Sequence, residues 1–128
     1  MTAELSLLAW SAVLMFVQAM IPATILLMSR GMPLAVGNRE NWPAGEGLCG
    51  RAQRAHRNML ENLPIFAALI LVAHVGGVSN DMTLLGAQLF FWARLVYAVV
   101  YIAGVPWVRT LVWFASVVGM AMIFLQLL

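Results

Sequence analysis

Long apolar stretches alternate with short polar segments along this chain. The first stretch, Leu5 to Met28, covers 24 residues. It is interrupted only by Ser6, Ser11, Gln18, Pro22 and Thr24. At about 1.5 Å per residue, a helix of this length crosses a hydrocarbon core of about 30 Å. The stretch therefore predicts a membrane-spanning helix, which Pro22 is expected to kink.

Three further apolar stretches follow a polar segment that is rich in glycine and proline. This segment, about residues 31–50, predicts a loop, and the helix after it has a polar first third. Gly76-Gly77 ends that helix, and Gly104-Val105-Pro106 makes a tight turn before the last one. The chain therefore predicts one domain, residues 1–128. Its four spans are expected over about residues 5–30, 51–76, 82–103 and 109–128.

The composition supports a membrane location. Apolar residues make up 63% of the 128 residues and charged residues only 9%, whereas a soluble domain carries about 25% charged residues. Lipid must therefore cover much of the surface, and the sequence predicts an all-α integral membrane four-helix bundle. A formal charge of +2 is too small to indicate a nucleic-acid partner. The single cysteine, Cys49, excludes an intramolecular disulfide framework.

The arginines are distributed unevenly between the predicted loops. Those in or beside the first and third loops are Arg30, Arg39, Arg51, Arg54, Arg57 and Arg109. The N-terminal segment and the loop of residues 76–81 have no basic residue. The positive-inside rule places the arginine-rich loops, one and three, in the cytoplasm and both termini on the other side of the membrane.

One face of the second predicted helix carries charged and polar side chains. Arg54, Arg57, Asn58 and Glu61 are spaced i, i+3, i+4 and i+7, which places them on the same helical face. Arginines that snorkel to the membrane surface would explain Arg51, one turn earlier, but explain the deeper Asn58 and Glu61 poorly. We therefore expect this face to line a binding site, either inside the bundle or in a cleft between subunits.

Arg94 lies in the middle of the third predicted span. An arginine at this depth costs about 2.5–3.5 kcal/mol on insertion scales, so it needs a partner. Glu61 is the acidic residue that is expected at the same depth. We therefore predict an ion pair between Arg94 and Glu61.

Further polar side chains gather at the cytoplasmic side of the third and fourth spans. Tyr97 and Tyr101 follow Arg94 at i+3 and i+7. An aromatic belt at the membrane surface would account for Tyr101 but less well for Tyr97. Arg109 and Thr110 begin the fourth span, where a helix N-terminus favours anions. Together with the arginines of the first two helices, these groups suit a small anion that has both carboxylate and amine groups.

Three segments hold most of these polar residues. They read Arg54-Ala-His56-Arg57-Asn58-Met-Leu-Glu61-Asn-Leu-Pro64, Arg94-x-x-Tyr97-x-x-x-Tyr101 and Gly104-Val-Pro106-Trp-Val-Arg109-Thr-Leu-Val-Trp113. This pattern resembles the MAPEG family, the membrane-associated proteins in eicosanoid and glutathione metabolism, in a bacterial form, and the resemblance spans nearly the whole chain. It implies a homotrimer of four-helix bundles in the bacterial inner membrane, with periplasmic termini. Glutathione, the co-substrate, would bind between neighbouring subunits near the cytoplasmic face.

The resemblance also implies roles for individual residues. In family members, glutathione contacts come from residues that match Arg30, Arg54, Arg57, Asn58, Glu61, Tyr97 and Tyr101. Arg94 joins them as part of the same polar stripe. Arg109 matches an arginine that stabilises the glutathione thiolate, to which Thr110 or Tyr101 could add a hydrogen bond. Thr110 and Trp113 replace a serine and a tyrosine of some eicosanoid-forming relatives, which disfavours a prostaglandin-type isomerase.

The expected activity is that of a membrane-embedded glutathione transferase or peroxidase. Its thiolate would attack a lipophilic electrophile, or a peroxide, that arrives from the bilayer. The sequence names no second substrate and leaves open an alternative, a non-catalytic scaffold or regulatory protein that keeps the fold and glutathione binding. A small transporter is disfavoured because the chain has no repeat and no pair of discontinuous helices. No metal site is expected, since His56 and His74 lie near opposite membrane faces.

Overall fold

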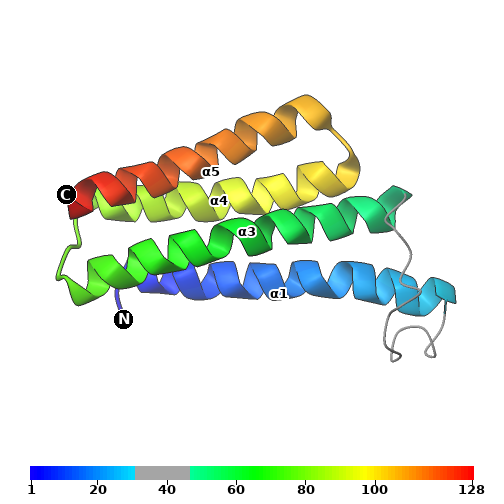
Figure 1. The fold of residues 1–128 in the computed structure, drawn as a ribbon, viewed down its shortest axis with the longest axis horizontal. Coiled ribbons are helices and arrows are strands. Elements are labelled where there is room, and N and C mark those ends of the chain that lie inside the picture. The colour runs from blue at the N-terminus through cyan, green and yellow to red at the C-terminus, as the bar shows by residue number, and fades with distance from the viewer. Residues whose placement is uncertain (31–46) are drawn as a thin grey trace.

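The computed structural model describes residues 1–30 and 47–128. They form four helices: α1 (Ala3–Arg30), α3 (Gly47–Val75), α4 (Asp81–Ala103) and α5 (Pro106–Leu127). All four are long and apolar enough to cross a membrane, which confirms the prediction of an all-helical bundle with four apolar spans. Both termini lie at one end of the bundle, which we call the terminal end (Figure 1). The opposite end, where α1 ends and α3 begins, is the loop end.

Local sequence explains the ends of α4 and the start of α5. The Asn80 side chain accepts hydrogen bonds from Met82 N and Thr83 N at 3.0 Å each, and the Thr83 hydroxyl accepts one from Asn80 N at 2.9 Å. Gly104 ends α4 in the left-handed conformation, with φ 84°, which suits a residue without a Cβ atom. α5 then begins at Pro106, before the predicted start at residue 109, because proline at the first helical position has no amide proton to leave unpaired.

α3 begins at Gly47, before the predicted start at Arg51. The extra turn packs against α1. Gly50 is buried, and the Cys49 thiol lies 4.0 Å from the Pro22 carbonyl oxygen, within reach of a weak hydrogen bond. Glycines indicate a loop in the sequence, but here Gly47 and Gly50 belong to the first turn of the helix.

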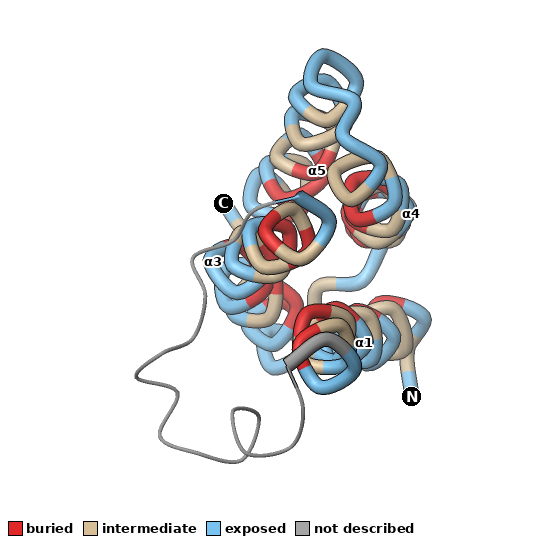
Figure 2. Tube along the Cα trace, turned by 90° about the vertical axis from the view of Figure 1, so that its right-hand side faces the viewer, coloured by how far each residue is buried: buried red, intermediate tan, exposed pale blue. Residues whose placement is uncertain are grey.

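α3 and α4 form the centre of the bundle, with α1 on one side and α5 on the other (Figure 1). α1 and α5 do not contact each other anywhere in residues 1–30 and 47–128. At the centre, the rings of Phe66 and Phe90 stack with their centroids 3.9 Å apart. Figure 2 shows that exposed residues follow the outward side of every helix. Many of them are large and apolar, which suits a lipid environment.

α4 and α5 meet at two glycines. A Cβ atom on Gly86 would lie 2.6 Å from the Gly119 carbonyl oxygen, and a Cβ atom on Gly119 would lie 2.6 Å from the Gly86 carbonyl oxygen. No side chain fits between these two backbones. Small residues are typical of membrane helix crossings because close van der Waals packing is a main source of helix association in lipid.

Replacing Gly119 with leucine is expected to push α4 and α5 apart. The expected loss of stability is about 1–3 kcal/mol, the usual cost of overpacking. The matched control is Val118→Leu, at the neighbouring exposed position, which should leave stability unchanged. Thermal unfolding in detergent, followed by circular dichroism, measures both variants. Equal melting temperatures would contradict the importance of the glycine contact.

Candidate functional site at the loop end

A pocket of about 180 Å³ lies towards the loop end of the bundle. It is lined by Asn58 of α3, Tyr97 of α4, and Arg109, Thr110 and Trp113 of α5. Asn58, Tyr97, Arg109 and Thr110 were all predicted site residues, and the packing of α3, α4 and α5 brings them together. The Arg109 guanidinium and the N-terminal end of α5 both carry positive charge. The pocket is therefore suited to an anion.

Two arginines and two tyrosines form a continuous row on the pocket side of α4. The Arg94 guanidinium carbon lies 4.2 Å from the centroid of the Tyr97 ring. The Tyr97 and Tyr101 centroids are 5.5 Å apart, and the Arg109 guanidinium carbon lies 4.6 Å from the Tyr101 centroid. An aromatic face attracts a cation by about 0.5–2 kcal/mol. The row therefore holds Arg109 of α5 against α4 and orients its guanidinium.

The polar face of α3 points mostly away from its own chain. Arg54, Arg57 and Glu61 are exposed on the outer surface of the bundle, while Asn58 turns partly inward to line the pocket. The side chain of Arg30, the last residue of α1, lies outside the described residues. The exposed surfaces of Arg57 and Glu61 are therefore open to lipid or to a neighbouring subunit.

Comparison with known protein families matches residues 6–128 to the MAPEG family. The chain belongs to this family. The match covers nearly the whole chain and includes all three polar segments. No curated protein matches this MAPEG chain. In the part of the chain that the structure describes, no three His, Cys, Asp or Glu side chains are grouped so that they could hold a metal ion.

The predicted ion pair between Arg94 and Glu61 is not formed within the MAPEG chain. Arg94 is 1% exposed, and none of its guanidinium nitrogens has a hydrogen-bond partner among the described residues. α3 and α4 run antiparallel, and Phe66 of α3 stacks on Phe90 of α4. Asn62 lies four residues before Phe66 and Arg94 lies four residues after Phe90, so Asn62 and Arg94 are at the same depth in the bundle. Glu61 is the neighbour of Asn62 and points about 100° away around α3. Depth in the membrane was therefore not enough to identify the facing residue.

Gln18 of α1 stands at the same level as Arg94. Glu4 at the start of α1 accepts a hydrogen bond from the Ser79 hydroxyl just before α4, and these two helices run in parallel. Gln18 lies roughly 20 Å beyond Glu4 along α1, and Arg94 lies roughly 20 Å beyond Ser79 along α4. Gln18 is 2% exposed, and within residues 1–30 and 47–128 its amide atoms have no hydrogen-bond partner. Gln18, Asn62 and Arg94 thus form a buried polar layer.

Two residues with clear structural roles were not among the predicted site residues. Trp113 lines the pocket one turn after Arg109, and the i, i+4 spacing could have indicated it. Arg51, expected only to snorkel, donates from Nε to Ile102 O at 2.8 Å. This bond satisfies a carbonyl in the last turn of α4, where helical partners run out. Only the packing of α3 on α4 reveals it.

Arg94→Met and Arg51→Met are expected to differ in their effect on stability. The Arg51 variant loses a charged hydrogen bond to Ile102 O, which should cost about 1.5–3 kcal/mol. The Arg94 variant removes a buried charge, and replacing such a charge by an apolar side chain is often neutral or stabilising. Unfolding temperatures in detergent measure both. A larger loss for Arg94→Met would show that a stabilising partner holds this guanidinium.

Proposed function

We propose that this MAPEG protein is a membrane-embedded, glutathione-dependent transferase or peroxidase. The observation that carries the proposal is the pocket in which Arg109, Tyr97 and Asn58 converge from three helices. Glutathione carries two carboxylates, an ammonium and a thiol, and guanidinium groups bind carboxylates through paired N–H donors. Membership of the family and the three polar segments that resemble its motifs support this choice of ligand.

In this proposal a neighbouring copy of the chain completes the site. The pocket of one chain, about 180 Å³, is smaller than the roughly 300–1,000 Å³ usual for small-molecule sites. Arg54, Arg57 and Glu61 lie on the outer surface of α3, although charged side chains at membrane depth avoid lipid. Packing this face against a second subunit covers these charges and enlarges the site. A homotrimer, the assembly that the resemblance implies, does so for every subunit through one repeated interface.

The reaction begins with ionisation of the glutathione thiol. A free thiol has a pKa of about 8.5, and a neighbouring cation favours the thiolate. Arg109 supplies that cation, with its guanidinium held against the Tyr101 ring. The Tyr101 hydroxyl adds a donor. So does the Thr110 hydroxyl, whose present bond to Pro106 O is long at 3.4 Å.

The thiolate then attacks a lipophilic substrate that enters from the bilayer. With an electrophilic carbon, a carbon–sulfur bond forms and the leaving group departs with its bonding electrons. With a hydroperoxide, the sulfur takes the terminal oxygen and an alcohol is released. A second glutathione then yields glutathione disulfide and water, so the peroxide is reduced as the two thiols are oxidised.

The arginines suggest the orientation of the protein in the membrane. Arg51, Arg54, Arg57 and Arg109 lie towards the loop end, and the positive-inside rule assigns this end to the cytoplasm. In a bacterial inner membrane the glutathione site then faces the cytoplasm, and both termini lie in the periplasm.

Arg109→Ala should lower the rate of glutathione conjugation about 10²-fold, because the thiolate loses the donor that stabilises its charge. Arg109→Lys, which keeps the charge without the planar fork, should retain part of the rate. Calorimetry measures glutathione affinity, and the ultraviolet absorbance of the bound thiolate measures its ionisation. An Arg109→Ala protein with unchanged absorbance and rate would disprove the assigned role.

Glutathione binding without turnover of any electrophile or peroxide would favour a scaffold or regulatory protein.

Mixed oligomers test whether subunits share the site. Arg57→Ala and Arg109→Ala chains, each inactive alone, are co-expressed with different tags and the mixed assemblies are purified. If Arg57 of one subunit and Arg109 of the next serve the same glutathione, about a third of the interfaces are intact, since a trimer that contains both chains joins an intact Arg57 to an intact Arg109 at one interface. Activity should return to about that level. Mixed assemblies that stay inactive would mean that each chain builds its own site.

A further inference from the structure

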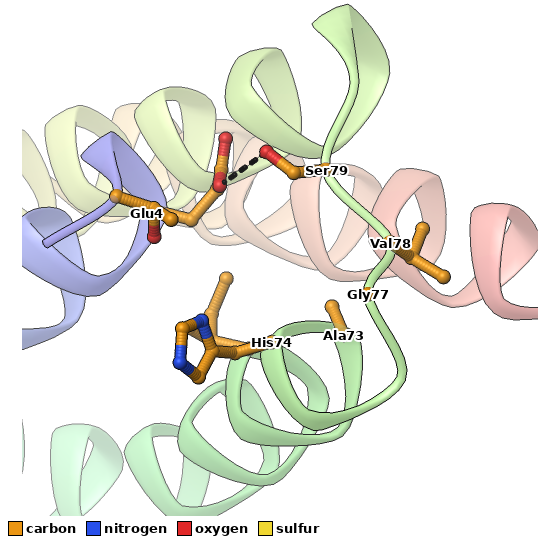
Figure 3. Close-up of a pocket in the computed structure, with 8 residues that line it drawn as sticks. Glu4, Ala73, His74, Gly77, Val78 and Ser79 are labelled. Atoms are coloured by element: carbon orange, nitrogen blue, oxygen red, sulfur yellow. Dashed lines mark hydrogen bonds between the residues drawn. The ribbon is translucent and has the colours of Figure 1, made fainter.

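A second pocket lies at the terminal end of the bundle, away from the proposed glutathione site (Figure 3). Its volume is about 150 Å³. The polar residues that line it are Thr2, Glu4, His74 and Ser79. They come from the start of α1, the last turns of α3 and the segment that leads into α4. None of them belongs to the glutathione site proposed above.

Glu4 supplies the negative charge of this pocket. Its side chain is 8% exposed, and Figure 3 shows it directed towards Ser79, whose hydroxyl donates to Glu4 Oε2 at 3.0 Å. A carboxylate has about four acceptor positions, and this bond uses one of them. Acceptor capacity therefore remains for a ligand in the pocket.

No lysine or arginine side chain among the described residues lines the pocket to neutralise Glu4. The side chains of Thr2 and Asn80 accept hydrogen bonds from the first turns of α1 and α4, so these amide donors are partly satisfied within their own helices. The last turn of α3, which carries a partial negative charge, borders the pocket at His74. Met1 is 96% exposed and does not line the pocket. The chain has no lysine, and no arginine lines this pocket.

We propose that this pocket binds the primary ammonium group of a small amine, the group carried by ethanolamine and by the headgroup of aminophospholipids. An ammonium has three N–H donors. The pocket offers acceptors to these donors, the Glu4 carboxylate and the Ser79 hydroxyl oxygen, and the His74 side chain also lines it. A pocket of about 150 Å³ holds an amine of a few heavy atoms.

Other cations fit this pocket less well. Calcium and magnesium require about six or more oxygen ligands, and the pocket has one carboxylate. A quaternary ammonium has no N–H group to offer these acceptors. The pocket also lies at the end of membrane-spanning helices, which is the depth of lipid headgroups. A primary amine can therefore reach it either from water or as part of a lipid.

Nanodiscs of two compositions test the lipid source. One contains phosphatidylcholine alone, and the other also contains phosphatidylethanolamine. A ligand that binds only the folded state raises the unfolding temperature, so the full-length protein should unfold several degrees higher with phosphatidylethanolamine. Glu4→Gln keeps a partner for Ser79 but removes the charge, and should lose this shift. Asp81→Asn is the matched control, since it removes an acid at the same end that does not line the pocket, and should keep the shift.

Ethanolamine, added to the protein in phosphatidylcholine nanodiscs, tests binding of the free amine. Choline is the control. A Glu4-dependent rise in unfolding temperature with phosphatidylethanolamine but not with ethanolamine supports a lipid headgroup site. A Glu4-dependent rise with ethanolamine supports a site for amines in general. The proposal is overturned if neither probe shifts the wild type, or if Glu4→Gln responds as the wild type does. Glutathione affinity should be the same in all three proteins, so this test does not depend on the proposed function.

Discussion

The contact between Gly86 and Gly119 holds α4 and α5 together, and the geometry of the site depends on it. Lipid does not drive helices together by the hydrophobic effect, so backbone packing at this crossing fixes the pair. From here the two helices diverge towards the loop end (Figure 1). The divergence leaves room for the pocket beside Tyr97, and Arg109, which stacks on Tyr101, also lines this pocket. The same helix pair is therefore tightly packed at the glycine contact and open towards the loop end.

Side chains of opposite charge lie at opposite ends of the bundle. The loop end carries most of the arginines and the pocket lined by Arg109, and the terminal end carries Glu4 and a pocket that no arginine lines. Between them, apolar turns are interrupted by the layer of Gln18, Asn62 and Arg94. Such a distribution lets one small chain present unlike charges to the two faces of a membrane without an ion pair across its interior.

The sequence predicted the helices well because membrane spans are set by length and apolar composition, which are local properties. It also singled out Asn58, Tyr97, Arg109 and Thr110, which line one pocket, because polar groups are rare in such helices and each one is conspicuous. It did not predict that Arg94 lies against the Tyr97 ring with no hydrogen-bond partner among the described residues, since neighbours on a facing helix share a depth but differ in direction by about 100°. The bond between Arg51 and Ile102, and the place of Trp113 in the pocket, depend on the packing between helices, which no local pattern contains.

The polar layer has a consequence for the order in which the helices are made. Synthesis proceeds from the N-terminus, so α1 with Gln18 and α3 with Asn62 reach the bilayer before α4 emerges. A lone α4 would carry its guanidinium into hydrocarbon at a cost of about 2.5–3.5 kcal/mol. When α4 enters, the buried amide side chains of Gln18 and Asn62 already lie at the depth of Arg94. The chain order thus places two amide side chains at this depth before the helix that carries the buried arginine is inserted.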